Sequence, residues 1–254
     1  MNNWVAFQTI VIKEVSRVLR IWKQTIFPSA ITMTLYFIIF GNLIGSQIND
    51  IGGFSYMQFI VPGLIMMAVI TNTYMNVCSS FYVSKFNRQI EELFVAPVHN
   101  STIIFGFVSG GMVRGLIVGC AVWLVSFLFT SSPVSHPFIV IAFMLLTTLV
   151  FSLAGFINGI FANSFDDITT IPTFVLTPLT YLGGVFYSLD LLPEFFKTLS
   201  KLNPILYMVN GLRYGFLGVS DVDVIFGFLM LILFAVILFA VCIYLMNRGI
   251  RMKH

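Results

Sequence analysis

The sequence predicts an all-α membrane protein with six transmembrane helices, and three features of the chain lead to this prediction. Apolar residue types make up 58% of the 254 residues and charged types only 9%, too little polar surface to cover a water-facing globule. Long stretches without Asp, Glu, Lys or Arg recur along the chain, and each can hold a helix of about 20 residues, the length that crosses a bilayer. These apolar runs are continuous rather than alternating, which excludes a closed β-barrel.

The uncharged stretches give the positions of the predicted spans. The stretch 115–165 is long enough for two crossings, and turn residues around Pro133 and Pro137 divide it. Glycines spaced by four residues in the third and fourth spans, such as Gly155 and Gly159, predict close helix packing without identifying the partner helix. The six predicted spans are residues 26–45, 57–79, 104–129, 138–161, 169–188 and 224–246.

The distribution of basic residues predicts the orientation of the chain. Nine Lys and Arg residues flank the spans on one side, in the N-terminal segment, the loop near 81–100 and the C-terminal tail. The other side has three, all in the connection 189–223. Because basic residues concentrate on the cytoplasmic side of membrane proteins, we expect both termini in the cytoplasm and one domain, 1–254, that crosses the membrane several times.

The N-terminal segment 4–23 is predicted to be an amphipathic helix at the inner membrane interface. Its apolar residues recur at steps of three or four from Trp4 to Trp22, and basic residues follow the same spacing on another face.

A second cytoplasmic helix is predicted within residues 81–97, because its apolar residues also have helical spacing and Pro97 ends it. Taken alone, the pattern fits a solvated loop as well as a docking element for a cytoplasmic partner. The charged residues of this segment are Lys85, Arg88, Glu91 and Glu92.

The connection 189–222 is predicted to form two short helices on the outer side. Leu192 and Pro193 open the first, and Asn203 followed by Pro204 has the form of an N-cap with proline at the first helical position. Both helices are too short to cross the bilayer and too apolar for a free loop, so we expect interfacial or re-entrant half-helices. Arg213 lies in the second of them.

Polar residues inside the predicted spans are few, and each allows two interpretations. Arg114 is the only charged residue there, and it either reaches the inner interface as a structural residue or lies in a translocation pathway. Asn72 and Asn76 lie one helical turn apart and either join helices or line a pathway. Gly183 and Gly184 are further candidates for packing or for the pathway.

The sequence contains none of the motifs that would indicate an enzyme. It has no G-x-x-x-x-G-K-[ST] phosphate loop, no H-E-x-x-H zinc helix and no G-x-S-x-G turn, and we expect no metal site. Its few basic residues form no dense patch, which argues against binding to nucleic acid. A solitary facilitator or ion-driven carrier remains an alternative to a transporter subunit powered by a partner.

Three stretches carry motifs of a known family. The stretch from Pro172 to Gly218 contains a Gly-Gly pair, an L-P pair, an N-P pair and then Tyr207, Arg213 and Tyr214. The other two are FNRQIEELFVAPV, and TLYFIIFGNLIG followed by FSYMQFIVPGLI. Over essentially its whole length the chain resembles the membrane subunit of type-2 ABC exporters, in particular the YadH-type inner-membrane transport permeases.

This resemblance implies a function and a set of partners. It implies a homodimeric permease in the bacterial inner membrane, coupled to a separately encoded ATP-binding subunit that binds ATP and Mg, with no cofactor in this chain. The helix in 81–97 would be the coupling helix that docks on the ATPase. An amphipathic or lipid-like substrate would cross at the dimer interface, beneath the outer half-helices.

Overall fold

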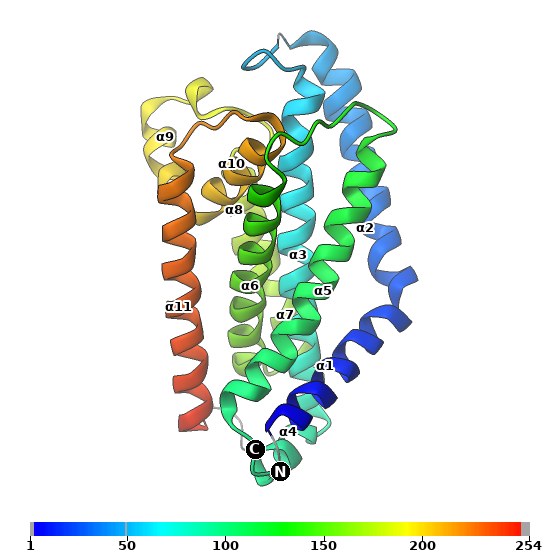
Figure 1. The fold of residues 1–254 in the computed structure, drawn as a ribbon, viewed down its shortest axis with the longest axis vertical. Helices are drawn as coiled ribbons and strands as arrows, with labels where there is room; N and C mark the ends of the chain where they lie inside the picture. Colours follow the sequence, from blue (N-terminus) through cyan, green and yellow to red (C-terminus); the bar gives the residue numbers. More distant parts are fainter. Residues whose placement is uncertain (1–2, 49, 250–254) are drawn as a thin grey trace.

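The computed structural model describes residues 3–48 and 50–249 and shows a bundle of helices along one long axis (Figure 1). The described residues contain no β-strand, only an isolated bridge between Ile51 and Phe54. The long helices are α1 (Asn3–Arg20), α2 (Trp22–Tyr36), α3 (Tyr56–Phe86), α5 (Asn100–Ser126), α6 (Pro137–Phe161) and α11 (Val224–Arg248). The shorter helices are α4 (Gln89–Val95), α7 (Phe165–Ile171), α8 (Thr177–Tyr181), α9 (Glu194–Lys201) and α10 (Pro204–Leu217).

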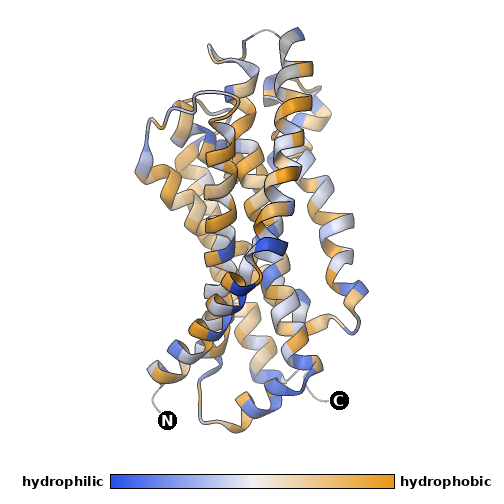
Figure 2. Ribbon diagram, turned by 90° about the vertical axis from the view of Figure 1, so that its right-hand side faces the viewer, coloured by the Kyte–Doolittle hydropathy of each residue, from blue (hydrophilic) through white to orange (hydrophobic). Residues whose placement is uncertain are grey.

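Five helices of the described chain are long and apolar enough to cross a membrane. They are Trp22–Gly41, Tyr56–Phe86, Asn100–Ser126, Pro137–Phe161 and Val224–Arg248, which correspond to predicted spans one to four and six. Figure 2 shows apolar residues along most of these helices, with hydrophilic residues gathered near the end that holds the termini and on the sloping N-terminal helix.

The predicted fifth span, 169–188, differs from a single long helix. The chain is helical from Phe165 to Tyr181, but in three consecutive pieces: α7, a π-helical turn at Pro172–Leu176, and α8. Pro172 has no N–H for the regular hydrogen-bond ladder, which accounts for the π-helical turn. A turn with a positive φ at Gly184 follows α8. The count of six spans therefore stays a prediction.

Helix α3 lies at the centre of the bundle and packs against α5, α6 and α10. In an apolar stretch of 18 residues of α3, 83% of the residues are buried, whereas in the corresponding stretch of α11 only 17% are buried. Apolar residues on α3 therefore form the core of the bundle, while most apolar residues on α11 face outward.

Glycines allow the helices around α3 to approach closely, as their spacing predicts. A Cβ atom at Gly155 of α6 would overlap the backbone of Tyr74 in α3, and one at Gly111 of α5 would overlap Val77. Gly106 and Gly110 of α5 instead lie against Ile10 and Glu14 of α1. The partner helices that the sequence leaves unidentified are thus α3 and α1 of the same chain.

The two ends of the described chain lie at one end of the bundle, beside α4 (Figure 1). The backbone N–H of His99 donates to Asn3 Oδ1, and Asn100 Nδ2 donates to Asn247 Oδ1 at 2.7 Å. Helices α9 and α10 lie at the opposite end (Figure 1). We call these the α4 end and the α9 end. The side of the membrane that each faces stays a prediction.

Replacing Gly155 with alanine tests the close contact of α6 with α3. The added methyl group would overlap the Tyr74 backbone, so the helices must separate, and we expect the free energy of unfolding to fall by about 1–3 kcal/mol. Thermal unfolding of the purified protein in detergent measures this change. The control Ala240→Val adds volume on the exposed side of α11 and should leave Tm unchanged, so equal losses in the two variants would contradict the assignment.

Candidate functional site

The α4 end carries an exposed surface of mixed apolar and charged character, which we call the α4 surface. Phe86 is 63% exposed and Val95 is 87% exposed, although both are large apolar residues. Exposed apolar residues with a charged rim are typical of protein interaction sites. The apolar members of the α4 surface are Phe86, Phe94, Val95 and Phe165, and its charged members are Arg88, Glu91 and Glu92.

A tight turn directs α4 away from the end of α3. Arg88 adopts the left-handed conformation with φ 59°, which is uncommon for a residue other than glycine and reverses the chain between the two helices. Ile90 is buried and anchors α4 to the bundle. Glu91 and Glu92 lie in the first turn of α4, where carboxylates interact favourably with the helix dipole and remain exposed.

Lys85 does not belong to this surface, contrary to the expectation that it contributes to a docking contact. It lies in the last turn of α3 and is buried, and its ammonium group donates to the backbone oxygens of Ile160, at 2.8 Å, and Ala162. The side chain satisfies carbonyls at the C-terminus of α6, a favourable place for a cation. We therefore leave Lys85 out of the α4 surface.

Helix α1 lies beside α4 and extends this surface. Lys13 Nζ donates to Gln89 Oε1 at 3.1 Å, which joins the two helices at their exposed faces. A cavity of about 390 Å³ opens between them, lined by Thr9, Ile10, Lys13, Gln89, Glu92, Leu93 and Phe107.

Farther along α1, a group of polar residues joins three helices and is linked to a fourth. We call it the arginine cluster; its members are Glu14 and Arg17 of α1, Asn72, Asn76 and Ser80 of α3, and Arg114 of α5. Asn72 Nδ2 also donates to Ser29 Oγ of α2 at 2.9 Å. The two asparagines thus join helices, as one of their two interpretations predicts, and a role in a pathway stays a prediction.

Arg114 lies about midway along α5 rather than near its end, because α5 begins at Asn100. Its guanidinium donates to Asn72 Oδ1 at 3.1 Å and reaches Asn76 Oδ1 at 3.5 Å. A cation at such a position requires polar partners inside the protein, and the amides of α3 supply them.

Glu14 is a functional candidate that sequence reasoning missed. It is fully buried, and its Oε2 accepts from Arg17 at 3.0 Å and from Ser80 at 2.7 Å. The predicted apolar stripe of α1 begins at Trp4, which is 60% exposed, while the face packed on α5 contains Ala6, Ile10, Glu14 and Val18. Glu14 contacts Gly110 only because α1 and α5 pack side by side, and the sequence alone does not show this packing.

At the α9 end, Arg213 organises the connection between α8 and α11. It is fully buried, stacks 3.8 Å from the ring of Phe59, and donates to the backbone oxygen of Gly184 at 2.6 Å. Its Nη1 donates to Asn210 Oδ1 at 3.3 Å and lies 3.9 Å from Asp221 Oδ2. Asp221 in turn accepts from Ser188 and from the N–H of Leu189.

The two short helices at this end begin where the sequence predicts. Asn203 accepts from the N–H of Ile205 as the N-cap of α10, Pro204 is the first helical residue, and Pro193 precedes α9. Gly183 packs against Ile205, and Gly184 has φ +71°, a turn conformation that favours glycine. A role of either glycine in a pathway stays a prediction. That these helices are re-entrant stays a prediction.

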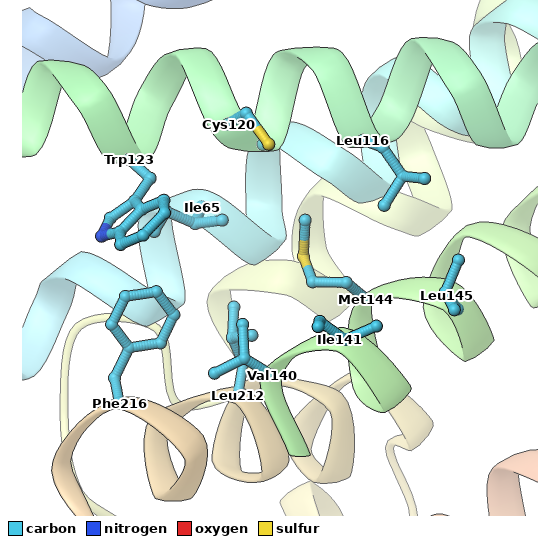
Figure 3. Close-up of a pocket in the computed structure, with 11 residues that line it drawn as sticks. Ile65, Leu116, Cys120, Trp123, Val140, Ile141, Met144, Leu145, Leu212 and Phe216 are labelled. Atoms are coloured by element: carbon cyan, nitrogen blue, oxygen red, sulfur yellow. The ribbon is translucent and has the colours of Figure 1, made fainter. Parts of the chain in front are cut away.

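An apolar pocket of about 240 Å³ opens between α5, α6 and α10 (Figure 3). Trp123 and Phe216 face each other at one side, with ring centroids 5.9 Å apart, and Met144 and Leu116 lie at the other (Figure 3). Apart from Trp123 and Cys120, its lining is made of aliphatic, glycine, methionine and phenylalanine residues.

Comparison with known proteins gives the class of this chain. The family described as ABC-2 type transporter matches residues 5–217. The chain is 60% identical over 247 residues to "Inner membrane transport permease YadH" of Escherichia coli strain K12, covering 97% of this chain and 96% of that protein. It is 23% identical over 208 residues to "Nodulation protein J" of Rhizobium leguminosarum bv. trifolii, covering 80% of this chain and 79% of that protein. The chain belongs to the ABC-2 type transporter family, which confirms the resemblance found in its motifs.

Replacing Arg213 with glutamine should strongly destabilise the α9 end. The change leaves the Gly184 oxygen and Asp221 without their cation, and loss of one partner from a buried pair costs about 3 kcal/mol or more. Thermal unfolding in detergent measures the loss. Arg213→Lys should restore little of it, because lysine cannot reproduce the planar fork of donors. The exposed control Lys201→Gln should match the wild type; a matching Tm for Arg213→Gln would refute the role of Arg213.

Proposed function

We propose that this chain is the membrane-spanning permease subunit of an ATP-binding-cassette exporter. Two copies form the translocation pathway, and a separately encoded ATPase binds ATP and Mg and supplies the energy. Membership of the ABC-2 type transporter family and 60% identity to a protein named an inner membrane transport permease support this assignment. The location is accordingly the bacterial inner membrane.

The α4 surface is the observation that carries the proposal. A solvated loop would not expose Phe86 and Val95 at the end of a bundle, whereas a docking surface would bury them against a partner. The charged residues at the rim give the contact its register. The abundance of basic residues predicts that this end faces the cytoplasm, where an ATPase operates.

Helix α3 links the docking surface to the membrane. It is one helix of 31 residues that begins at the α9 end and ends at the turn before α4. A displacement of α4 on closure of the ATPase therefore reaches the centre of the bundle through a continuous helix. In this proposal ATP binding shifts the equilibrium between inward-facing and outward-facing arrangements of the dimer.

The segment from Phe165 to Tyr181 is the fifth crossing in this proposal. The chain is near the α4 end after α6, where the Tyr82 hydroxyl donates to the Asn163 oxygen. It is near α10 when α8 ends, because Asn203 donates to the Leu179 oxygen at 2.6 Å. The segment thus passes along the bundle, and a second copy of the chain covers part of its exposed apolar side. The helices α9 and α10 form the outer lid over an amphipathic or lipid-like cargo.

Reversing the charges Arg88 and Glu92 tests the docking role. We expect Arg88→Glu together with Glu92→Lys to reduce the amount of ATPase that co-purifies by about tenfold or more, since mismatched charges at an interface cost several kcal/mol. Quantitative affinity purification of the tagged permease from membranes measures the ratio of the two subunits. The control Lys197→Glu changes a charge at the α9 end and should leave that ratio unaltered.

Two results would contradict the docking role of α4. One is wild-type association of the ATPase with the charge-reversed permease. The other is transport by the purified permease alone that continues when ATP is removed, which would favour a solitary carrier.

The orientation is tested by cysteine labelling of intact cells with a permeable outer membrane. In a Cys120→Ser background, which removes the exposed native thiol, a membrane-impermeant maleimide should label Lys197→Cys but not Glu92→Cys. Disruption of the inner membrane should make both positions reactive. Labelling of Glu92→Cys before disruption would reverse the proposed topology.

A further inference from the structure

The arginine cluster contains more positive charge than its surroundings neutralise. Arg17 and Glu14 form an ion pair at 3.0 Å. Arg114 has no carboxylate within ion-pair distance among residues 3–48 and 50–249, whose three ion pairs involve other cations. The cluster therefore contains two guanidinium groups and one carboxylate, which pairs with Arg17 alone, inside a chain where charged residues are rare. An excess cation of this kind in a membrane span is a functional-site candidate.

The two arginines of the cluster also have too few hydrogen-bond acceptors for their donors. Both guanidinium groups turn to the same amide oxygen, Asn76 Oδ1, at 3.1 Å from Arg17 and 3.5 Å from Arg114. The Nε atoms of both arginines are buried and have no hydrogen-bond partner in the described part of the chain. Charge-assisted bonds from guanidinium to an anionic oxygen are shorter and stronger than bonds to a neutral amide.

The cluster also contains one carboxylate oxygen without a hydrogen-bond partner in the described chain, and it is enclosed within the bundle. Glu14 Oε1 also has no partner among the described residues, but Glu14 is fully buried against Gly110, between α1 and α5. Arg17 is 30% exposed and Arg114 is partly exposed. Part of each guanidinium side chain is therefore exposed, although its Nε is buried, whereas the carboxylate of Glu14 is wholly enclosed.

The location of the cluster limits what can approach it. It lies where α1, the predicted interfacial helix, meets α2 and the central helices, and two further cations, Arg20 and Lys23, are exposed near this corner. Basic side chains at an interface attract anionic lipid headgroups. A ligand that reaches Arg17 and Arg114 from the bilayer has its polar end at the membrane interface and its apolar end in the hydrocarbon.

We propose that the arginine cluster binds the phosphate or carboxylate headgroup of an anionic amphiphile from the inner leaflet. Arg17 and Arg114 donate to its oxygens, and the exposed Arg20 and Lys23 increase its local concentration. The site deepens the proposed function by narrowing the cargo to anionic amphiphiles, and in that respect it rests on the proposed function.

Lipid retention by the purified full-length permease tests this site without any ATPase. The protein is incubated in detergent with equal amounts of phosphatidylglycerol and phosphatidylcholine, washed, and the bound lipids are quantified by mass spectrometry. We expect the wild type to retain phosphatidylglycerol selectively. Parallel arms use palmitate, which offers a carboxylate, and inorganic phosphate as a competitor, which shows whether the headgroup alone occupies the site.

Four variants separate the site from general effects of charge. Arg114→Gln should lower the retention of phosphatidylglycerol roughly tenfold, as expected for the loss of charge-assisted bonds, and Arg114→Lys should lower it less. The double variant Glu14→Gln with Arg17→Gln removes the second arginine without leaving Glu14 buried and unpaired. Lys201→Gln removes an exposed positive charge at the α9 end, away from the cluster, and is the control.

The results decide between the alternatives. Selective retention that is lost in the cluster variants and kept in Lys201→Gln supports the site. Selective retention of palmitate in place of phosphatidylglycerol indicates a carboxylate ligand. Equal retention of the two phospholipids by the wild type, together with no retention of palmitate, overturns it. If Arg114→Gln fails to fold, Arg114→Lys and the double variant still decide. Failure of this test leaves ATPase association intact, and failure of ATPase association leaves lipid binding intact.

Discussion

Close packing of α3 against its neighbours is the constraint on which the rest of the structure depends. In a bilayer the lipid tails are as apolar as leucine, so burial of apolar surface alone does not hold helices together. Glycines such as Gly111 and Gly155 let α5 and α6 approach the backbone of α3, and dispersion and polar contacts can then act over the whole interface. The arginine cluster and the contact of α10 with α3 both require α3 to stay in this position.

Helix length and the start of short helices could be predicted from the sequence, because both depend on local chemistry. Uninterrupted apolar stretches predicted α3, α5, α6 and α11 as long helices, and the Asn203-Pro204 pair predicted the start of α10. The fifth predicted span was less regular than expected, since its prolines remove backbone donors even though its composition is as apolar as that of a span.

The candidate site could be predicted only in part, because the burial of a polar side chain depends on distant helices. The sequence indicated Arg88, Glu91 and Glu92 as a charged helix face, and the structure leaves them exposed. It could not indicate that Lys85 would be buried against the end of α6, or that Glu14 would lie on the packed face of α1. Apolar periodicity does not distinguish core from lipid-facing sides when both surroundings are apolar.

The contact of Lys85 with α6 has a mechanical consequence. Its ammonium group joins the ends of α3 and α6 just before the turn into α4. A displacement of α4 would therefore act on both helices. At its other end, α6 packs against α10, where Gly211 and Gly215 lie against Phe143 and Val140. Lys85 at the α4 end would thus couple the movement of α3 to the movement of α10 at the α9 end.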